Sequence, residues 1–248
     1  TTEIYTLSLH DALPICPSSV PNAVAAAKAP LLFFPVRSAP VAAIRDWLSG
    51  FGGLVDGFEL RSIRKWKRSH IGHRSFTVVR HPLLRAHVAF RDRIVSGLMA
   101  DHRRTLIRAY KARLPDPGQP FASIEAEREA FLVFLNYARL ATLGQTGQRV
   151  DPAWASQSAI LQGFAIFHPL DLVLREDRLP QALAYLAAEV GLPDAPPAPP
   201  VAADAIAALA AIYDSSLETA AEAAYARDYM GFGFGRWCDQ PGSQLNKS

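Results

Sequence analysis

The stretch that decides the fold is SFTVVRHPLLRAHVAF, which runs from Ser75 to Phe90. Its first six residues, Ser75–Arg80, are mostly β-branched or apolar and predict a buried strand. Pro82 follows almost at once, and proline suits the first turn of a helix, where its missing N–H is not needed. The residues after Pro82 keep helical spacing. A buried strand that leads directly into a helix indicates an α/β domain.

Further strands and helices alternate on both sides of this stretch. Strands are expected at Leu31–Val36, Asp56–Leu60 and Leu172–Glu176. Helices are expected at 41–48, 61–70, 101–113, 123–143, 180–190 and 202–230. Because short buried strands are followed by helices, the sequence predicts an α/β fold with a central, mainly parallel sheet flanked by many helices. A single domain is expected over 30–237, with 238–248 as a tail.

The composition fits a folded domain. Of the 248 residues, 50% are hydrophobic and 20% are charged, which excludes a disordered chain. Two cysteines, Cys16 and Cys238, are too few for a disulfide framework or a four-cysteine zinc site. No apolar run reaches the roughly 20 residues needed to cross a bilayer, so a soluble, cytoplasmic protein without a transmembrane segment is expected.

The first residues are different in character from the rest. The segment TTEIYTLSLHDALPI, Thr1–Ile15, resembles the in-frame translation of a sequencing adapter. The alternative is a natural N-terminal strand followed by a turn. On the first interpretation residues 1–16 are a non-native segment, and His10 and Asp11 belong to no site.

Positive charge is concentrated in one part of the chain. Between Arg61 and Arg113 there are 15 Lys or Arg residues and only two acids, Asp92 and Asp101. Such a cluster attracts anionic ligands. Most of these side chains are expected to form a solvated face. Nucleic acid is not the expected partner, because no nucleic-acid-binding motif accompanies the charge.

The end of the Ser75–Arg80 strand predicts an anion site. Free N–H groups at the start of the following helix attract a negative group, and Arg80 adds a charged fork beside them. Histidines elsewhere have no companions at metal-ligand spacing, so no metal is expected. A polyanionic small molecule is the ligand that this arrangement favours.

Four short patterns occur in a fixed order along the chain. They are formed by Arg80, His81, Pro82 and Arg85; by Asp151, Trp154 and Gln157; by Glu176 and Leu179; and by Tyr225, Arg227, Asp228, Tyr229, Phe232 and Gly233. In these four patterns and in their order along the chain, the sequence resembles the PAPS-dependent sulfotransferases, especially their carbohydrate and nodulation-type branch. The resemblance covers Phe76 to Phe234.

The resemblance implies a P-loop-like sulfotransferase fold and a specific activity. A sulfuryl group would pass from 3′-phosphoadenosine 5′-phosphosulfate (PAPS) to a hydroxyl of a carbohydrate or glycolipid. Arg80 and Arg85 would bind the 3′-phosphate, and Arg37 with Ser38 the 5′-phosphosulfate. Arg37 would also stabilise the leaving group.

Two further roles follow from the same resemblance. Glu59 is the candidate base for the acceptor hydroxyl, with a surface glutamate as the alternative. Trp154 and Gln157 would shape the acceptor pocket, although a tryptophan is also a common core residue.

The chain departs from the family at several positions of the phosphate loops. Ser38 stands at the family's lysine position, Ala42 and Ala43 at its hydroxyl positions, and Val88 at its 3′-phosphate serine. A catalytically impaired pseudoenzyme that acts as a binding or scaffold protein is therefore the second interpretation. A P-loop kinase is disfavoured because the Gly-Lys-Ser/Thr loop is missing.

Overall fold

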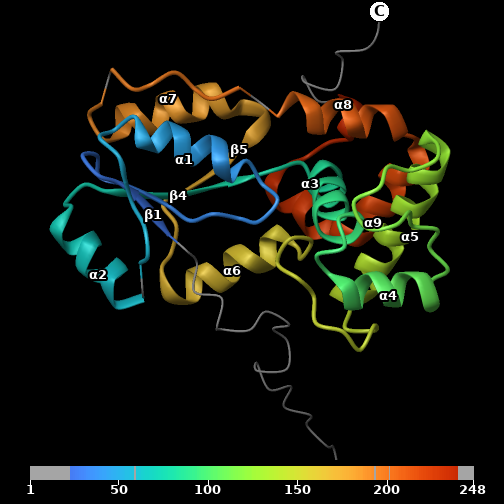
Figure 1. Cartoon of the computed structure of the whole chain (residues 1–248). Coiled ribbons are helices and arrows are strands. Elements are labelled where there is room, and N and C mark those ends of the chain that lie inside the picture. The colour runs from blue at the N-terminus through green and yellow to red at the C-terminus, as the bar shows by residue number, and fades with distance from the viewer. Residues whose placement is uncertain (1–22, 59, 193, 201, 240–248) are drawn as a thin grey trace, which may run out of the picture.

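The structure, a computed structural model, describes residues 23–58, 60–192, 194–200 and 202–239. Its described strands form one five-stranded sheet in the order β3-β1-β2-β4-β5. They are β1 (Val24–Ala26), β2 (Leu31–Phe33), β3 (Leu54–Val55), β4 (Arg74–Val79) and β5 (Leu172–Arg175). Helices flank this sheet and extend well beyond it on one side (Figure 1). The predicted α/β class is confirmed.

The sheet is mixed, and the prediction of a mainly parallel sheet is wrong. Strands β2, β4 and β5 are parallel neighbours. Strand β1, however, pairs antiparallel with both β2 and β3. The sequence did not indicate β1, because the strand is only three residues long and two of them are alanines, which are depleted in strands. The parallel part of the sheet therefore consists of β2, β4 and β5, from its centre to one edge.

The helices occupy most of the rest of the described chain. They are α1 (Val41–Ser49), α2 (Leu60–Ser69), α3 (Pro82–Ala89), α4 (Ala100–Arg108), α5 (Ile124–Thr142), α6 (Gln157–Phe167), α7 (Leu179–Glu189), α8 (Ala203–Ile212) and α9 (Ser215–Phe232). Helix α3 continues directly into a π-helical segment, Phe90–Val95, and short 3₁₀ turns lie at Glu176–Arg178 and Trp237–Asp239.

Two buried clusters hold the helices to the sheet. Helices α1 and α7 cover the upper face in Figure 1, where Trp47 and Leu183 join Phe76 of β4 in one cluster. Helix α6 lies under the opposite face, and its Phe164 contacts Phe34 with ring centroids 5.7 Å apart. Beside the sheet, α5 and α9 pack together with α3 and α8. The architecture is a layered α/β core joined to a helical group.

Two expected elements differ from the structure, and one helix of the structure was not expected. The predicted strand at Asp56–Leu60 is wrong, since the strand is Leu54–Val55 and α2 begins at Leu60. The single helix expected over 202–230 is divided at Tyr213 and Asp214, where the Asp214 side chain accepts the N–H of Leu217 and caps α9. Helix α6 was not expected. Thr1–Ile15, which the sequence suggests are non-native, and the candidate base Glu59 lie outside the described residues.

In the described part of the chain, no helix combines the length and the apolar character needed to cross a membrane.

Candidate functional site

The segments that follow β2 and β4 meet at one edge of the sheet. The two strands are parallel neighbours, so their carboxyl ends point the same way. The guanidinium of Arg80, just after β4, donates from Nη1 to the carbonyl of Ser38, just after β2, at 3.0 Å. The structure therefore places these two segments side by side.

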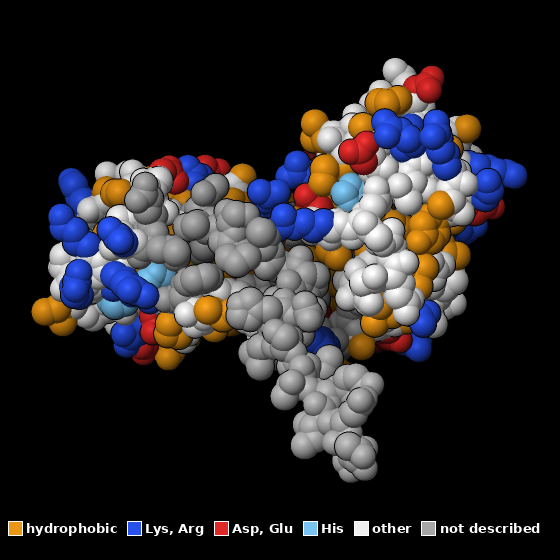
Figure 2. Space-filling model, turned by 90° about the horizontal axis from the view of Figure 1, so that it is seen from below, with side chains coloured by type: hydrophobic (Ala, Val, Ile, Leu, Met, Phe, Trp, Pro, Cys, Tyr) orange, Lys and Arg blue, Asp and Glu red, His pale blue; other side chains and the backbone are white. Residues whose placement is uncertain are grey.

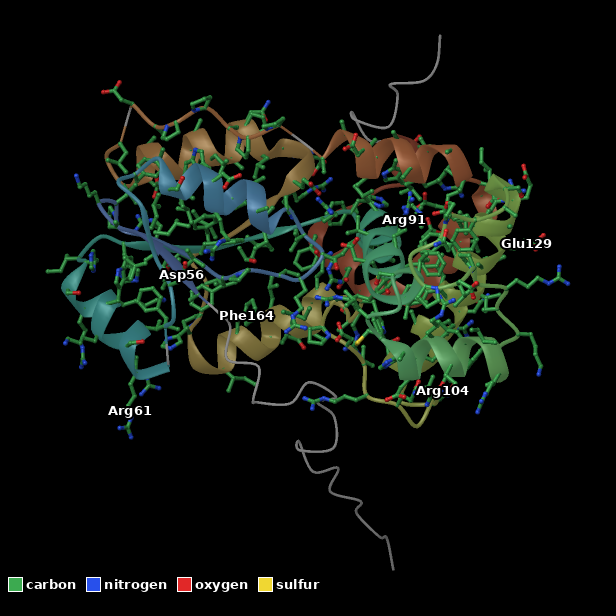
Figure 3. The ribbon with its side chains drawn as sticks, viewed as in Figure 1. Asp56, Arg61, Arg91, Arg104, Glu129 and Phe164 are labelled. Carbon is green, nitrogen blue, oxygen red and sulfur yellow. The ribbon has the colours of Figure 1, made fainter. Side chains whose placement is uncertain are left out.

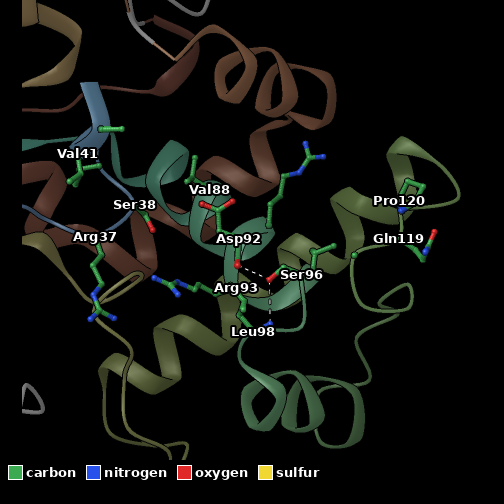
Figure 4. Close-up of a pocket in the computed structure, with 15 residues that line it drawn as sticks. Arg37, Ser38, Val41, Val88, Asp92, Arg93, Ser96, Leu98, Gln119 and Pro120 are labelled. Atoms are coloured by element: carbon green, nitrogen blue, oxygen red, sulfur yellow. Dashed lines mark hydrogen bonds between the residues drawn. The ribbon is translucent and has the colours of Figure 1, made fainter. Parts of the chain in front are cut away.

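A cleft of about 950 Å³ opens beside this edge. One wall is the loop and first turn of α1, and the other is the end of α3 with the π-helical segment, as Figure 4 shows. A short loop at 118–120 contributes to the far end. The volume is in the range of small-molecule sites.

Three arginines line this cleft. They are Arg37 from the loop after β2, and Arg91 and Arg93 from the π-helical segment. The Arg37 side chain is 55% exposed, and its Nη1 lies 4.0 Å from Asp151. In Figure 4 the Arg93 side chain extends toward the Arg37 side of the cleft. Asp92 also lines the cleft, so the positive charge is not uniform.

The start of α1 adds a second feature that attracts anions. No side chain caps this helix, and its first turn holds no acid. Ala39, Val41 and Ala42 from this start line the cleft. Uncapped N–H groups and the helix dipole favour a negative group there. Helix start and arginines together define an anion-binding cleft.

The π-helical segment was the part of this site that sequence reasoning missed. A π-helix widens the turn and changes the direction of the side chains relative to an α-helix. Regular helical spacing placed Arg91 on the same face as Leu84 and Val88, with no indication of a break. The structure brings Val88 and Arg91 to the cleft together, and the wider π-helical turn also places Asp92 and Arg93 there.

Arg80 lies beneath the cleft and is not among its lining residues. It is 3% exposed, and Glu176 at the end of β5 accepts from its Nε at 2.6 Å and from its Nη2 at 2.7 Å. With the Ser38 carbonyl, this buried bidentate ion pair occupies three of the five guanidinium N–H groups. The Arg80 side chain thus connects the segments that follow β2, β4 and β5.

Arg85 is also buried and also holds the loop. Its guanidinium donates to the carbonyl oxygens of Arg37, Pro152 and Ala155 at 2.9, 2.6 and 2.6 Å. Burial lowers the pKa of Arg85 to about 10, so the group is still charged at neutral pH. Its described partners are backbone carbonyls, which gives it a structural role in this arrangement.

These two arginines fix an unusual backbone. Ser38 has a φ of 62°, the left-handed region that non-glycine residues rarely adopt. Its carbonyl accepts from Arg80, and that of the preceding Arg37 accepts from Arg85. We infer that the two buried guanidinium groups hold the loop in this shape and so place the Arg37 side chain at the cleft.

The predicted acceptor residues lie in the interior. Trp154 is fully buried, with its ring centroid 5.0 Å from that of His102 and 5.7 Å from that of Phe134. Gln157 is fully buried, and its side chain exchanges two hydrogen bonds with the backbone of Arg80, at 3.0 and 2.8 Å. Neither side chain lines the cleft, and their contact with an acceptor stays a prediction.

His81 is buried beside the candidate site. Its Nε2 lies 3.0 Å from the carbonyl of Gly235 and so carries the proton, while the buried Nδ1 has no hydrogen-bond partner among the described residues. Tyr229 and Phe234 stand edge-on to the ring. Burial lowers the pKa of His81 to about 4.

This buried histidine predicts an acid-dependent loss of stability. Between pH 6.5 and about 4, the unfolded chain binds a proton at His81 that the folded chain does not. The free energy of unfolding should therefore fall by about 2 kcal/mol from this group between pH 7 and pH 5. Urea titrations of wild type and His81→Asn at both pH values measure it. The variant should lose about 2 kcal/mol less, and an equal loss in both proteins would contradict the prediction.

Comparisons of this chain with protein-family models, with curated proteins and with solved structures find no match. Across the described ranges, no group of three or more His, Cys, Asp or Glu side chains is placed to hold a metal ion.

Proposed function

We propose that this protein binds PAPS in the cleft and transfers the sulfuryl group to a hydroxyl of a carbohydrate or glycolipid, on a P-loop-like sulfotransferase fold. The observation that carries the proposal is the convergence of Arg37, Arg93 and the uncapped start of α1 on one cleft. Open α/β sheets bind nucleotides at this carboxyl edge. The four sequence patterns in family order support the same class.

PAPS, when bound, supplies an activated sulfuryl group. Its bond to the 5′-phosphate oxygen would break as the acceptor hydroxyl oxygen bonds to sulfur, and 3′-phosphoadenosine 5′-phosphate would leave. The hydroxyl proton would pass to a base, for which Glu59 is the candidate. Arg37 and the N–H groups of α1 would bind the 5′ end of PAPS and neutralise the charge that develops on the leaving oxygen. Ser38, which lines the same wall, would hydrogen-bond to this end. Arg91 and Arg93 on the opposite wall would bind the 3′-phosphate.

Arg80 and Arg85 take a different part in this proposal from the one that the resemblance implied. Both are buried, and both bind the loop through carbonyl groups. We infer that they position Arg37 and Ser38, and that direct contact with the 3′-phosphate falls to the cleft arginines. Arg80, at the end of β4, would then affect nucleotide binding indirectly, by holding the loop that carries Arg37 and Ser38.

A second candidate is a protein of the same class that binds the nucleotide without transferring sulfate. Ala42 lines the cleft at a position where the family carries a hydroxyl. The loss of that donor weakens stabilisation of the transferring group and leaves the arginines to bind the anion. This specific substitution favours the binding protein as the alternative.

Titration calorimetry with 3′-phosphoadenosine 5′-phosphate tests the proposed site. We expect binding by the wild type and a loss of about ten- to a hundred-fold in each of Arg37→Gln and Arg93→Gln, because a hydrogen bond to a charged group contributes about 1.5–3 kcal/mol. Arg104→Gln is the matched control, since Arg104 is exposed on α4 and outside the cleft. It should bind like wild type.

The outcomes separate the two candidates. Binding together with label transfer from sulfur-labelled PAPS to oligosaccharides supports the transferase. Binding without transfer supports the binding protein. An absence of nucleotide binding, or an equal loss in Arg104→Gln, contradicts both.

A further inference from the structure

We propose that α2 docks this protein on a membrane surface that contains anionic lipid. The basic face of α2 consists of Arg61, Arg64, Lys65 and Arg68. The proposed binding surface is this basic face and Ile71, which follows the helix. It lies at the opposite end of the described sheet from the helical group (Figures 1 and 2). None of these five residues lines the arginine-lined cleft.

The spacing of the four cations places them on one side of the helix. Positions i, i+3, i+4 and i+7 share a face, and all four side chains are exposed. Figure 2 shows Lys and Arg side chains gathered at this end, and Figure 3 shows Arg61 pointing away from the sheet. The helix is therefore strongly amphipathic, with cations on one face.

The opposite side of α2 anchors the helix to the protein. Ile63 is fully buried, and Trp66 stacks on His70 at 4.2 Å and meets Phe58 edge-on at 6.4 Å. Lys67 turns inward, where its Nζ donates to Ser75 Oγ at 3.2 Å. Since these contacts fix the orientation of the helix, the basic face stays toward solvent.

The charge of the basic face is not compensated within the described ranges. None of its four side chains takes part in an ion pair there. Other arginines near this end are paired, as in Arg45 with Asp56 at 2.7 Å and Arg74 with Glu189 at 3.0 Å. Four cations on one face, without an ion-pair partner among the described residues, attract an anionic surface.

Ile71 distinguishes a lipid surface from other polyanions. It follows Arg68 by three residues and is 95% exposed, in the turn that Gly72 completes with a φ of 80°. An aliphatic side chain beside cations inserts favourably at the boundary between headgroups and acyl chains. A sulfated polysaccharide and the phosphate backbone of a nucleic acid offer no apolar layer that would receive this side chain. The combination therefore favours lipid.

Co-sedimentation with phosphatidylcholine vesicles containing about 30% phosphatidylserine tests the proposal. Each cation near such a surface strengthens binding about five-fold, so Arg64→Gln/Arg68→Gln should bind about thirty-fold more weakly. Ile71→Ser should bind about five-fold more weakly because the apolar contact is lost. Arg108→Gln/Arg113→Gln, which removes two exposed charges elsewhere, should change binding less than two-fold. Circular dichroism checks that each variant is folded.

Several results would overturn the proposal. One is failure of the wild-type protein to bind these vesicles more tightly than vesicles of phosphatidylcholine alone. A second is an equal loss in the two double variants, which would indicate a non-specific charge effect. A third is binding that is insensitive to Ile71→Ser and weaker than binding to a DNA duplex, which would assign the basic face to nucleic acid. Because vesicle and nucleotide binding are measured separately, failure here leaves the proposed function intact.

Discussion

Glu176→Ala is expected to lower the free energy of unfolding by about 3–5 kcal/mol. The substitution removes the carboxylate that accepts two short hydrogen bonds from Arg80 and leaves the guanidinium charge buried without its counter-ion. Both side chains of the ion pair are almost fully buried, at 4% and 6% exposed, so water does not replace the lost partner. Urea unfolding at pH 7 measures the change.

A double variant provides the matched control for this ion pair. Removing both charges, as in Arg80→Met/Glu176→Leu, should destabilise the protein less than Glu176→Ala alone, because no unpaired charge remains. A loss below about 1 kcal/mol in Glu176→Ala would contradict the buried pair.

The same ion pair connects stability to the cleft. Arg80 reaches the carbonyl of Ser38, so its orientation by Glu176 also fixes the loop that carries Arg37. Loss of Glu176 should then weaken nucleotide binding even in the folded fraction. Such coupling is expected of a positioning residue that lies outside the cleft.

Local sequence predicted much of the framework correctly. The apolar run of β4, the proline at the start of α3 and the basic helix α2 each follow from spacing and propensity. Ser123 caps α5 by accepting the N–H of Ala126, as a serine before a helical pattern indicates. These elements are determined by residues close together in the chain.

The parts that sequence did not predict depend on distant residues. The ion pair between Arg80 and Glu176 joins residues 96 positions apart, and only the parallel pairing of β4 with β5 brings them together. Because this ion pair forms, Arg80, which was expected to bind the 3′-phosphate, lies under the loop that follows β2 instead. Helix α6 begins where Asp228, far along the chain on α9, accepts the N–H groups of Gln157 and Ser158.

Trp154→Ala is the second substitution with a large expected effect, a loss of about 3–5 kcal/mol in the free energy of unfolding. The indole is fully buried between His102 and Phe134, and its removal leaves a cavity that the rigid neighbours fill only in part. The Trp154 carbonyl also accepts from the Tyr225 hydroxyl, a bond that the alanine backbone retains. The loss should therefore come from packing.

Two comparisons separate packing from acceptor binding at this residue. Trp154→Phe should lose less than half as much stability, since a ring remains and the buried indole N–H, which has no partner in the described part of the chain, is removed. Tyr185→Ala, at an aromatic residue that is 55% exposed, should change stability by less than about 0.5 kcal/mol. Thermal and urea unfolding measure all three variants, and nucleotide titration is repeated below each transition. If Trp154→Phe keeps full stability but loses transfer to an acceptor, the residue acts at the acceptor site, and the packing role argued from its burial is wrong.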